Sequence, residues 1–174
     1  MLYGVPFLFL FFQQKQKLEI ESFKQNAETL GFKKIEFKKL AQQTGQLIVL
    51  LLIVNFALAF VFSLLNLNDL DKVVQTINQI KETSPMLLVY LLTIRVIGEE
   101  IFFRGFLVPR SGILFSTIFF ALGHIGFGSI TEVVGAFILG GILAYWFQKY
   151  QNLYVNISAH LFYNFFLISL LNGV

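Results

Sequence analysis

The sequence predicts an all-α protein: a polytopic membrane helix bundle with about five transmembrane helices, an N-terminal partial span and an amphipathic interfacial segment. Composition is the first observation behind this prediction, because 56% of the 174 residues are hydrophobic, 22 are Phe and the mean hydropathy is +0.73. A soluble domain of this size cannot bury so much apolar surface, so lipid is the natural solvent. The second observation is that the apolar residues gather in five segments, with most charges in the connections.

The first 45 residues differ from the remainder, and we divide the chain into an N-terminal segment, 1–45, and a membrane core, 46–174. Residues 2–12 are apolar but too short to cross a hydrocarbon core of about 30 Å, and they lack the basic start and cleavage site of a signal peptide. We expect a partial span, a re-entrant segment or the remnant of a longer helix there. Residues 13–45 are polar and basic, and form either an amphipathic helix on the membrane, ended by Gly31, or a solvated linker. Apolar residues at roughly helical spacing indicate the helix: Leu18, Ile20, Phe23, Ala27 and Leu30.

Five segments follow as predicted spans: residues 47–66, 86–108, 112–127, 132–148 and 153–172. Seven of the thirteen basic residues lie within 15–39, so the positive-inside rule places that segment in the cytosol. The connection 67–85, with a net charge of −1, then falls outside. Arg110 and Lys149 return to the inside and Glu132 to the outside, so every connection agrees with the rule.

Polar side chains interrupt the apolar segments at a few places, although charges inside a bilayer are costly and usually mark a functional site. They are Glu99, Glu100, Arg104, His124, His160 and Asn164, and the two histidines are the only ones in the chain. A rise of about 1.5 Å per residue places Glu99, His124 and His160 about 11–18 Å from the predicted cytosolic ends of their segments. Three helices thus hold polar groups in one layer, and we expect these groups to converge.

Helix geometry separates the two glutamates. Arg104 follows Glu100 by four residues, the spacing of an ion pair on one helix face. Glu99 points about 100° away from Glu100 and is left to face a cavity, where a lone carboxylate suits a general base. Arg95, one turn before Glu99, either pairs with it or points into the cavity.

Two further pairs lie one helical turn apart. His160 and Asn164 share a face, and Phe120 is placed to pack on the ring of His124. Each group alone has a structural explanation, since an Arg–Glu pair can join helices and a buried histidine can be a satisfied core residue. The common depth of all the groups favours a site.

The residue types exclude several classes of hydrolase. The chain has no cysteine, which removes thiolate nucleophiles, disulfides and Cys-ligated metals. Ser111 lacks the preceding glycine of a serine-type intramembrane motif, and the only aspartates, Asp69 and Asp71, lie in a connection. The zinc motif H-E-x-x-H is absent as well.

Two mechanisms remain for this set of side chains. In the first, Glu99 takes a proton from a water that His124 helps to position. His160 and Asn164 then donate hydrogen bonds to the oxyanion. In the second, Glu99, His124 and His160 bind a divalent metal such as zinc, since two histidines, a glutamate and an open position form a catalytic zinc site. The first mechanism, which needs no cofactor, is preferred because three ligands on three helices leave no separate base.

Three stretches resemble the motifs of a known family: E-E-I-F-F-R at 99–104, F-A-L-G-H at 120–124 and H-L-F-Y-N at 160–164. They are similar to the motifs E-E-x-x-x-R, F-x-x-x-H and H-x-x-x-N of the CAAX protease and bacteriocin-processing (CPBP) family. This family is also called the Abi or type II CAAX prenyl endopeptidase-like family. The resemblance covers residues 86–172, about half of the chain.

The resemblance implies an intramembrane glutamate-type endopeptidase that acts on a peptide or protein in or at the membrane. Glu99 and His124 would activate water, and His160 with Asn164 would form the oxyanion site. The family's supporting positions fall on Glu100, Arg104 and Phe120. Eukaryotic members trim prenylated CAAX proteins, and bacterial members are associated with bacteriocin maturation and self-immunity. The Phe-, Ile-, Lys- and Asn-rich composition favours a bacterial cytoplasmic membrane protein, with its site toward the cytosol.

Other functions agree less well with the sequence. The main alternative is a non-catalytic membrane scaffold or immunity protein that binds a toxin, a sensor kinase or a lipid-linked partner. A small transporter is disfavoured because no internal repeat is evident. Nucleic-acid binding is disfavoured because the basic cluster alternates with glutamates. A peptide substrate and the lipid bilayer are therefore the expected partners.

Overall fold

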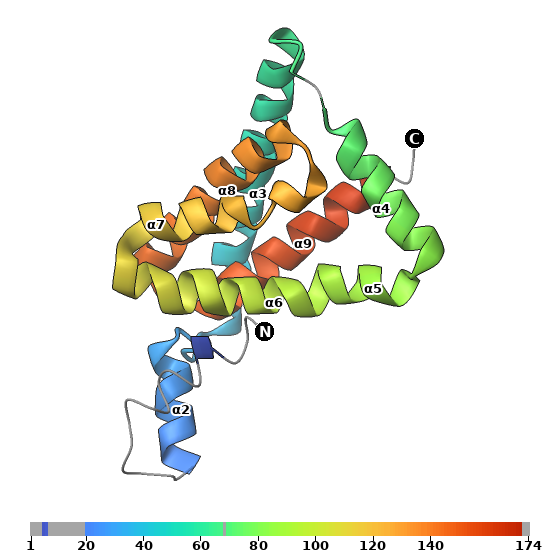
Figure 1. Ribbon diagram of the computed structural model, residues 1–174. Coiled ribbons are helices and arrows are strands. Elements are labelled where there is room, and N and C mark those ends of the chain that lie inside the picture. The colour runs from blue at the N-terminus through green and yellow to red at the C-terminus, as the bar shows by residue number, and fades with distance from the viewer. Residues whose placement is uncertain (1–4, 7–19, 68, 172–174) are drawn as a thin grey trace.

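The computed structural model describes residues 5–6, 20–67 and 69–171, and over these residues it contains helices and connections but no strand (Figure 1). The predicted all-α class is thereby confirmed. The elements in chain order are α2 (Ile20–Thr29), α3 (Phe37–Leu64), α4 (Asp71–Thr83), α5 (Pro85–Tyr90), η1 (Leu91–Arg95), α6 (Val96–Glu99), η2 (Glu100–Leu107), α7 (Val108–Leu122), η3 (Ile125–Phe127), α8 (Ile130–Tyr150) and α9 (Leu153–Leu171).

Among the described residues, three helices are long and apolar enough to cross a membrane by length and composition: α3, α8 and α9. They carry the predicted span 47–66 as far as Leu64, the span 132–148 in full, and the span 153–172 as far as Leu171. Of the predicted interfacial segment 13–45, residues 13–19 lie outside the described residues, and the remainder comprises α2, a connection and the first turns of α3, which begins at Phe37. The partial span predicted at residues 2–12 lies outside the described residues except for two positions.

The other two predicted spans are less regular. Residues 86–108 form one uninterrupted helical run from α5 to η2, with wide π-helical turns in η1 and η2. Such turns are frequent at functional sites, and this run carries the charged motif. Residues 112–127 differ more from the prediction. Gly112 has a φ of +81°, which favours glycine, and the regular helix beyond it ends at Leu122. This helix is too short to cross the bilayer alone.

The helices pack closely around the motif. Helix α7 lies along α8, α3 packs against α9, and the run from α5 to η2 crosses the view in Figure 1 above α2. Two close approaches depend on glycine. A Cβ atom at Gly140 in α8 would lie 2.6 Å from Cδ1 of Phe120, and one at Gly105 in η2 would lie 2.6 Å from the carbonyl oxygen of Leu30. Neither position has room for a larger residue without a shift.

Hydrogen bonds join the connections at one end of the bundle. The N–H of Leu153 donates to the carbonyl oxygen of Gly31 at 2.8 Å. The side chain of Asn152 donates from Nδ2 to the carbonyl oxygen of Lys33 at 2.9 Å. The segment after α2 is thus fixed to the α8–α9 connection, which the positive-inside rule assigned to the same side of the membrane.

Asp69 joins the connections at the other end. Its carboxylate accepts hydrogen bonds from the hydroxyls of Thr131 and Ser129, the latter at 2.7 Å, and from the N–H of Ile130 at 2.7 Å. These hydrogen bonds, those from the two hydroxyls foremost, hold the pKa of the Asp69 carboxyl well below its usual range. The start of α4 is thereby fixed to the start of α8, and the rule assigned these connections to one side as well. Which end faces the cytosol stays a prediction.

Candidate active site

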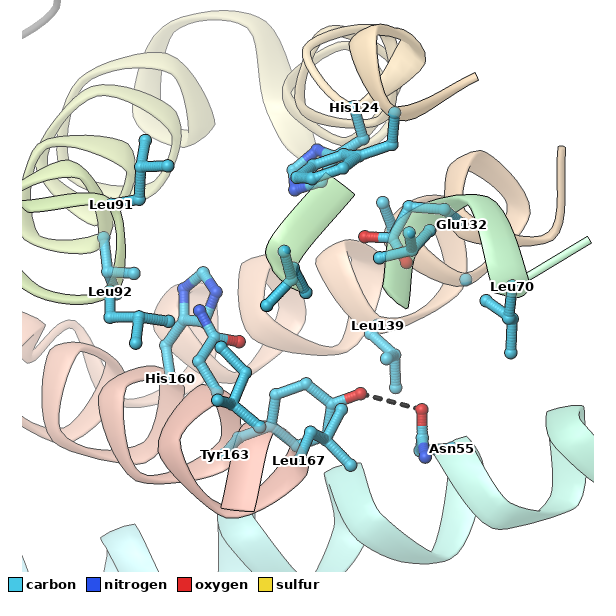
Figure 2. A pocket seen from close by; sticks show the side chains of 18 of the residues that line it. Asn55, Leu70, Leu91, Leu92, His124, Glu132, Leu139, His160, Tyr163 and Leu167 are labelled. Carbon is cyan, nitrogen blue, oxygen red and sulfur yellow. Dashed lines mark hydrogen bonds between the residues drawn. The ribbon is translucent and has the colours of Figure 1, made fainter. Parts of the chain in front are cut away.

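A cavity of about 370 Å³ lies among α3, α4, the run from α5 to α6, and helices α8 and α9. The four predicted catalytic residues, Glu99, His124, His160 and Asn164, all line it. His124 reaches it from the connection after α7, and His160 reaches it from α9 (Figure 2). Most of the other lining side chains are apolar. The structure therefore brings the predicted residues to one cavity, which extends from them toward α4 and the start of α8.

Glu99 is the last residue of α6, where the helix widens into the π turns of η2. Its side chain is only 6% exposed, and its Oε1 atom lies 2.8 Å from Nε of Arg95, one turn earlier. The Arg95 side chain is 28% exposed and also lines the cavity. Glu99 is therefore a paired carboxylate, whereas the sequence left it either lone or paired.

Glu100 is fully buried and joins η2 to α9. Its Oε1 atom lies 3.0 Å from an Arg104 guanidinium nitrogen and accepts a hydrogen bond from Nδ1 of His160 at 2.8 Å. Its Oε2 atom accepts from Nδ2 of Asn156 at 3.3 Å. A buried ion pair is costly to desolvate and is stable only with such additional hydrogen bonds. The pairing of Glu100 with Arg104, expected from their spacing, is present.

The Phe120 ring connects this ion pair to both histidines. The Arg104 guanidinium lies over the ring at 4.1 Å from its centroid and donates to the carbonyl oxygen of Gly140 at 3.4 Å. The ring centroids of Phe120 and His124 are 4.7 Å apart, and those of Phe120 and His160 are 6.1 Å apart. Phe120 thus has the contacts of a supporting residue.

The hydrogen bonds of the two histidines determine which ring nitrogen carries the proton. Nδ1 of His124 donates to the carbonyl oxygen of Phe120 at 2.8 Å, because a carbonyl can only accept. Nδ1 of His160 donates to the carboxylate of Glu100, which Arg104 pairs as an anion. In a neutral imidazole the other nitrogen, Nε2, is then an acceptor. His124 is thus suited to accept a hydrogen bond from water, and His160 can donate to an oxyanion only when doubly protonated.

Asn156 was missed by the sequence reasoning. It is fully buried and donates to the carbonyl oxygen of Leu143 at 2.9 Å as well as to Glu100. It precedes His160 by four residues, just as Asn164 follows His160 by four. This i, i+4 series on α9 was the signal that could have found it.

Two more polar groups of the cavity were missed. Tyr163 donates to Oδ1 of Asn55 in α3 at 2.8 Å, a pair so far apart in the chain that no spacing indicates it. Ser129 and Glu132 have the spacing of a capping box, and the Ser129 hydroxyl accepts from the N–H of Glu132 at 3.1 Å. Among the described residues nothing bonds to the Glu132 carboxylate in return, and it points into the cavity (Figure 2).

The metal centre considered from the sequence stays a prediction. Over the described residues, no group of three or more His, Asp or Glu side chains is arranged to hold a metal ion. Glu99 is paired with Arg95, and the Nδ1 atoms of both histidines are engaged, so Nε2 is the ring nitrogen that each could offer to a ligand.

The fold and the cavity together define a polytopic α-helical membrane protein with a carboxylate–histidine centre enclosed by its helices. Residues 81–166, about half of the chain, match the family model Rce1-like, described as type II CAAX prenyl endopeptidase Rce1-like. This region holds all three motifs, and through it the chain belongs to the CAAX protease family, whose members are membrane proteases. No curated protein and no solved structure matches the chain.

Proposed function

We propose that this chain is an intramembrane endopeptidase of the glutamate type, which hydrolyses a peptide bond of a membrane-associated peptide or protein. The observation that carries the proposal is the common cavity, which is lined by motif residues of α6, α7, the α7–α8 connection and α9. The family supports a protease. The apolar lining favours a substrate segment that enters the cavity from the bilayer.

In the proposed reaction, two acceptors hold the attacking water. The Glu99 carboxylate and Nε2 of His124 accept its two hydrogen bonds, and Glu99 removes one proton as the water oxygen attacks the scissile carbonyl carbon. The carbonyl oxygen becomes an oxyanion, to which the Asn164 amide donates, and His160 donates as well when doubly protonated. When the C–N bond breaks, Glu99 returns the proton to the leaving amine.

Glu100, Arg104 and Phe120 have positioning roles in this proposal. Glu100 fixes the tautomer and orientation of His160, and Phe120 packs on both imidazole rings. Arg104 neutralises Glu100 and stacks on Phe120. A site held by buried partners in this way keeps its geometry without reorganisation during the reaction.

For the biological process, we propose bacteriocin maturation or self-immunity in a bacterial membrane, which rests on the family's associations and on composition. The positive-inside rule supports a catalytic layer in the cytosolic half of the bilayer. The alternative, a non-catalytic scaffold or immunity protein, needs none of the catalytic side chains, and the same experiment separates the two.

The test is peptide cleavage by the purified protein in detergent, with a panel that includes a prenylated CAAX peptide, leader peptides and a peptide pool from membrane proteins. Glu99→Gln is expected to lower the rate by about 10²–10⁴-fold, the usual contribution of a general base. Glu28→Gln, at an exposed carboxylate of α2, is the matched control and retains activity. A strong chelator is expected to leave the rate unchanged. Loss in chelator with recovery in zinc would contradict the metal-free mechanism, and full function of Glu99→Gln in cells would favour the scaffold.

A further inference from the structure

The cavity contains few donors for the oxyanion that the proposed reaction forms. Both histidines use their Nδ1–H groups outside the cavity, so their neutral rings present acceptors to it. Among the described lining residues, the remaining side-chain N–H donors are the amides of Asn164 and Asn55 and the guanidinium of Arg95. Of these, only Arg95 carries a charge. Asn55 lies on α3, and its hydrogen bond is with Tyr163.

Arg95 is held next to the general base with donors to spare. Its Nε atom lies 2.8 Å from Oε1 of Glu99, and this is a single-point contact. No hydrogen bond or further ion pair engages the terminal guanidinium nitrogens within the described residues, although the Glu132 carboxylate of the same cavity is close enough to interact with the Arg95 charge. The side chain is 28% exposed and lines the cavity. Because a guanidinium is a rigid planar fork, fixing Nε also fixes the directions of the terminal N–H groups. The terminal N–H groups therefore lie next to Glu99, the carboxylate that accepts the proton from water.

The proposed reaction moves a negative charge within the cavity, and Arg95 is placed to stabilise it. When Glu99 takes the proton, its negative charge disappears and an equal charge appears on the carbonyl oxygen of the substrate. In an apolar cavity an uncompensated charge is costly, and a donor that is already in place stabilises it without reorganisation. Arg104, which is buried, is committed to Glu100 and to the face of Phe120. Arg95 is therefore the cation that can stabilise the negative charge both on Glu99 and, after the proton transfer, on the oxyanion.

We propose that Arg95 is a further catalytic residue: with Nε fixed on Glu99, its terminal guanidinium nitrogens donate to the oxygen of the scissile carbonyl, alongside the amide of Asn164. This inference rests on the proposed endopeptidase function. No atom is transferred by Arg95; the proton passes from water to Glu99 and then to the leaving amine, as described above.

The test compares Arg95→Gln, Arg95→Lys and Arg95→Ala with the wild-type protein in the cleavage assay. Arg95→Gln is expected to lower kcat by about 10²–10³-fold with little change in KM, as removal of one oxyanion donor does. Arg95→Lys keeps the charge but loses the fork, and is expected to lose about 10-fold or more. Guanidinium ion added to Arg95→Ala is expected to restore part of kcat. A phosphinic peptide, which mimics the tetrahedral intermediate, should lose affinity for Arg95→Gln in step with kcat/KM. Arg110→Gln, at an exposed arginine outside the cavity, is the control and retains wild-type kcat.

Each outcome supports or overturns the inference. If Glu99→Gln is inactive while Arg95→Gln keeps kcat within about 3-fold, or changes KM and melting temperature alone, then Arg95 is a structural ion-pair partner and only this inference fails. If Arg95→Gln does not fold, Arg95→Lys provides the test. A wild-type kcat in that variant would contradict the proposal that one guanidinium contacts Glu99 and the oxyanion at the same time. If Glu99→Gln is fully active, or the wild-type protein cuts no peptide of the pool, the proposed function fails first and this inference with it.

Discussion

The adjacent residues Glu99 and Glu100 have different environments and different proposed roles. Glu100 is completely buried and has three polar partners on its own helix and on α9. Glu99 is rotated about 100° from it and faces the cavity with Arg95. A buried carboxylate such as Glu100 is costly unless it is paired. Glu99 lines the cavity, where a water molecule could bind to it. Neighbours in the sequence can therefore carry a supporting and a catalytic role.

Arg104→Gln tests the supporting role of this ion pair. The substitution leaves the buried Glu100 carboxylate with the neutral donors His160 and Asn156, and removal of one partner of a buried pair typically costs about 3–5 kcal/mol. We expect a markedly lower thermal stability in detergent and loss of activity, measured by melting of the purified variant. Arg110→Gln, at an exposed arginine, is expected to change the unfolding free energy by less than about 1 kcal/mol. Equal losses in both variants would show that Arg104 has no special role.

At the scale of single helices, the approach of α8 to Phe120 depends on one glycine of a pair. A Cβ at Gly140 would overlap the Phe120 ring at 2.6 Å, whereas the nearest atom to a Cβ at Gly141 is a methyl carbon of Thr117 at 3.7 Å. Gly140→Ala is expected to displace the Phe120 ring, on which Arg104 and His124 pack. We expect this to lower the free energy of unfolding by about 1–3 kcal/mol and to abolish activity. Gly141→Ala is expected to be neutral or slightly stabilising, since alanine favours a helix over glycine by about 1 kcal/mol. Thermal melting of the two variants, side by side, checks this, and indistinguishable behaviour would contradict the packing argument.

The sequence could predict the helices but not all of their lengths. Hydropathy located α3, α8 and α9 because long apolar runs leave few alternatives in a bilayer. It overestimated the segment 112–127 because hydropathy does not register the positive φ of Gly112 or the turn before η3. Such a break arises from backbone conformation, which leaves the apolar character of the segment unchanged.

The same limit applies to the site. Spacing on one helix indicated Glu100 with Arg104 and His160 with Asn164, because i, i+4 neighbours meet on a helix face whatever the tertiary fold. Contacts between helices, such as Tyr163 with Asn55, leave no spacing in the sequence. The engagement of Nδ1 of His160 with Glu100 is of this kind, and it changes the donors available to the oxyanion.

On the scale of the whole molecule, Asp69 fastens the connection before α4 to the start of α8. Its folded-state pKa lies below the unfolded value of about 3.9, so its stabilising contribution is fully present above that value and is lost as the pH falls below it. We expect Asp69→Asn to melt at a lower temperature than the wild-type protein at pH 7, with the difference narrowing below about pH 4. Asp71→Asn, at an exposed aspartate two residues on, is the control and should show little difference at either pH. A difference for Asp69→Asn that does not change with pH would contradict the assignment.

The orientation in the membrane decides from which side a substrate reaches the site. The cavity extends toward α4 and the start of α8, and the positive-inside rule places this end outside, even though it also places the catalytic layer toward the cytosolic half. The chain has no cysteine, so single cysteines introduced at exposed positions can be labelled without interference. Glu82→Cys, at the end of α4, is expected to react with a membrane-impermeant maleimide in intact cells, and Lys149→Cys, at the end of α8, only after permeabilisation. That result would mean that the cavity faces the outer side and that a cytosolic substrate must enter through the bilayer between helices. The reverse labelling would contradict the charge-based orientation and would point the cavity at the cytosol, where a prenylated or leader-bearing peptide could reach Glu99 directly.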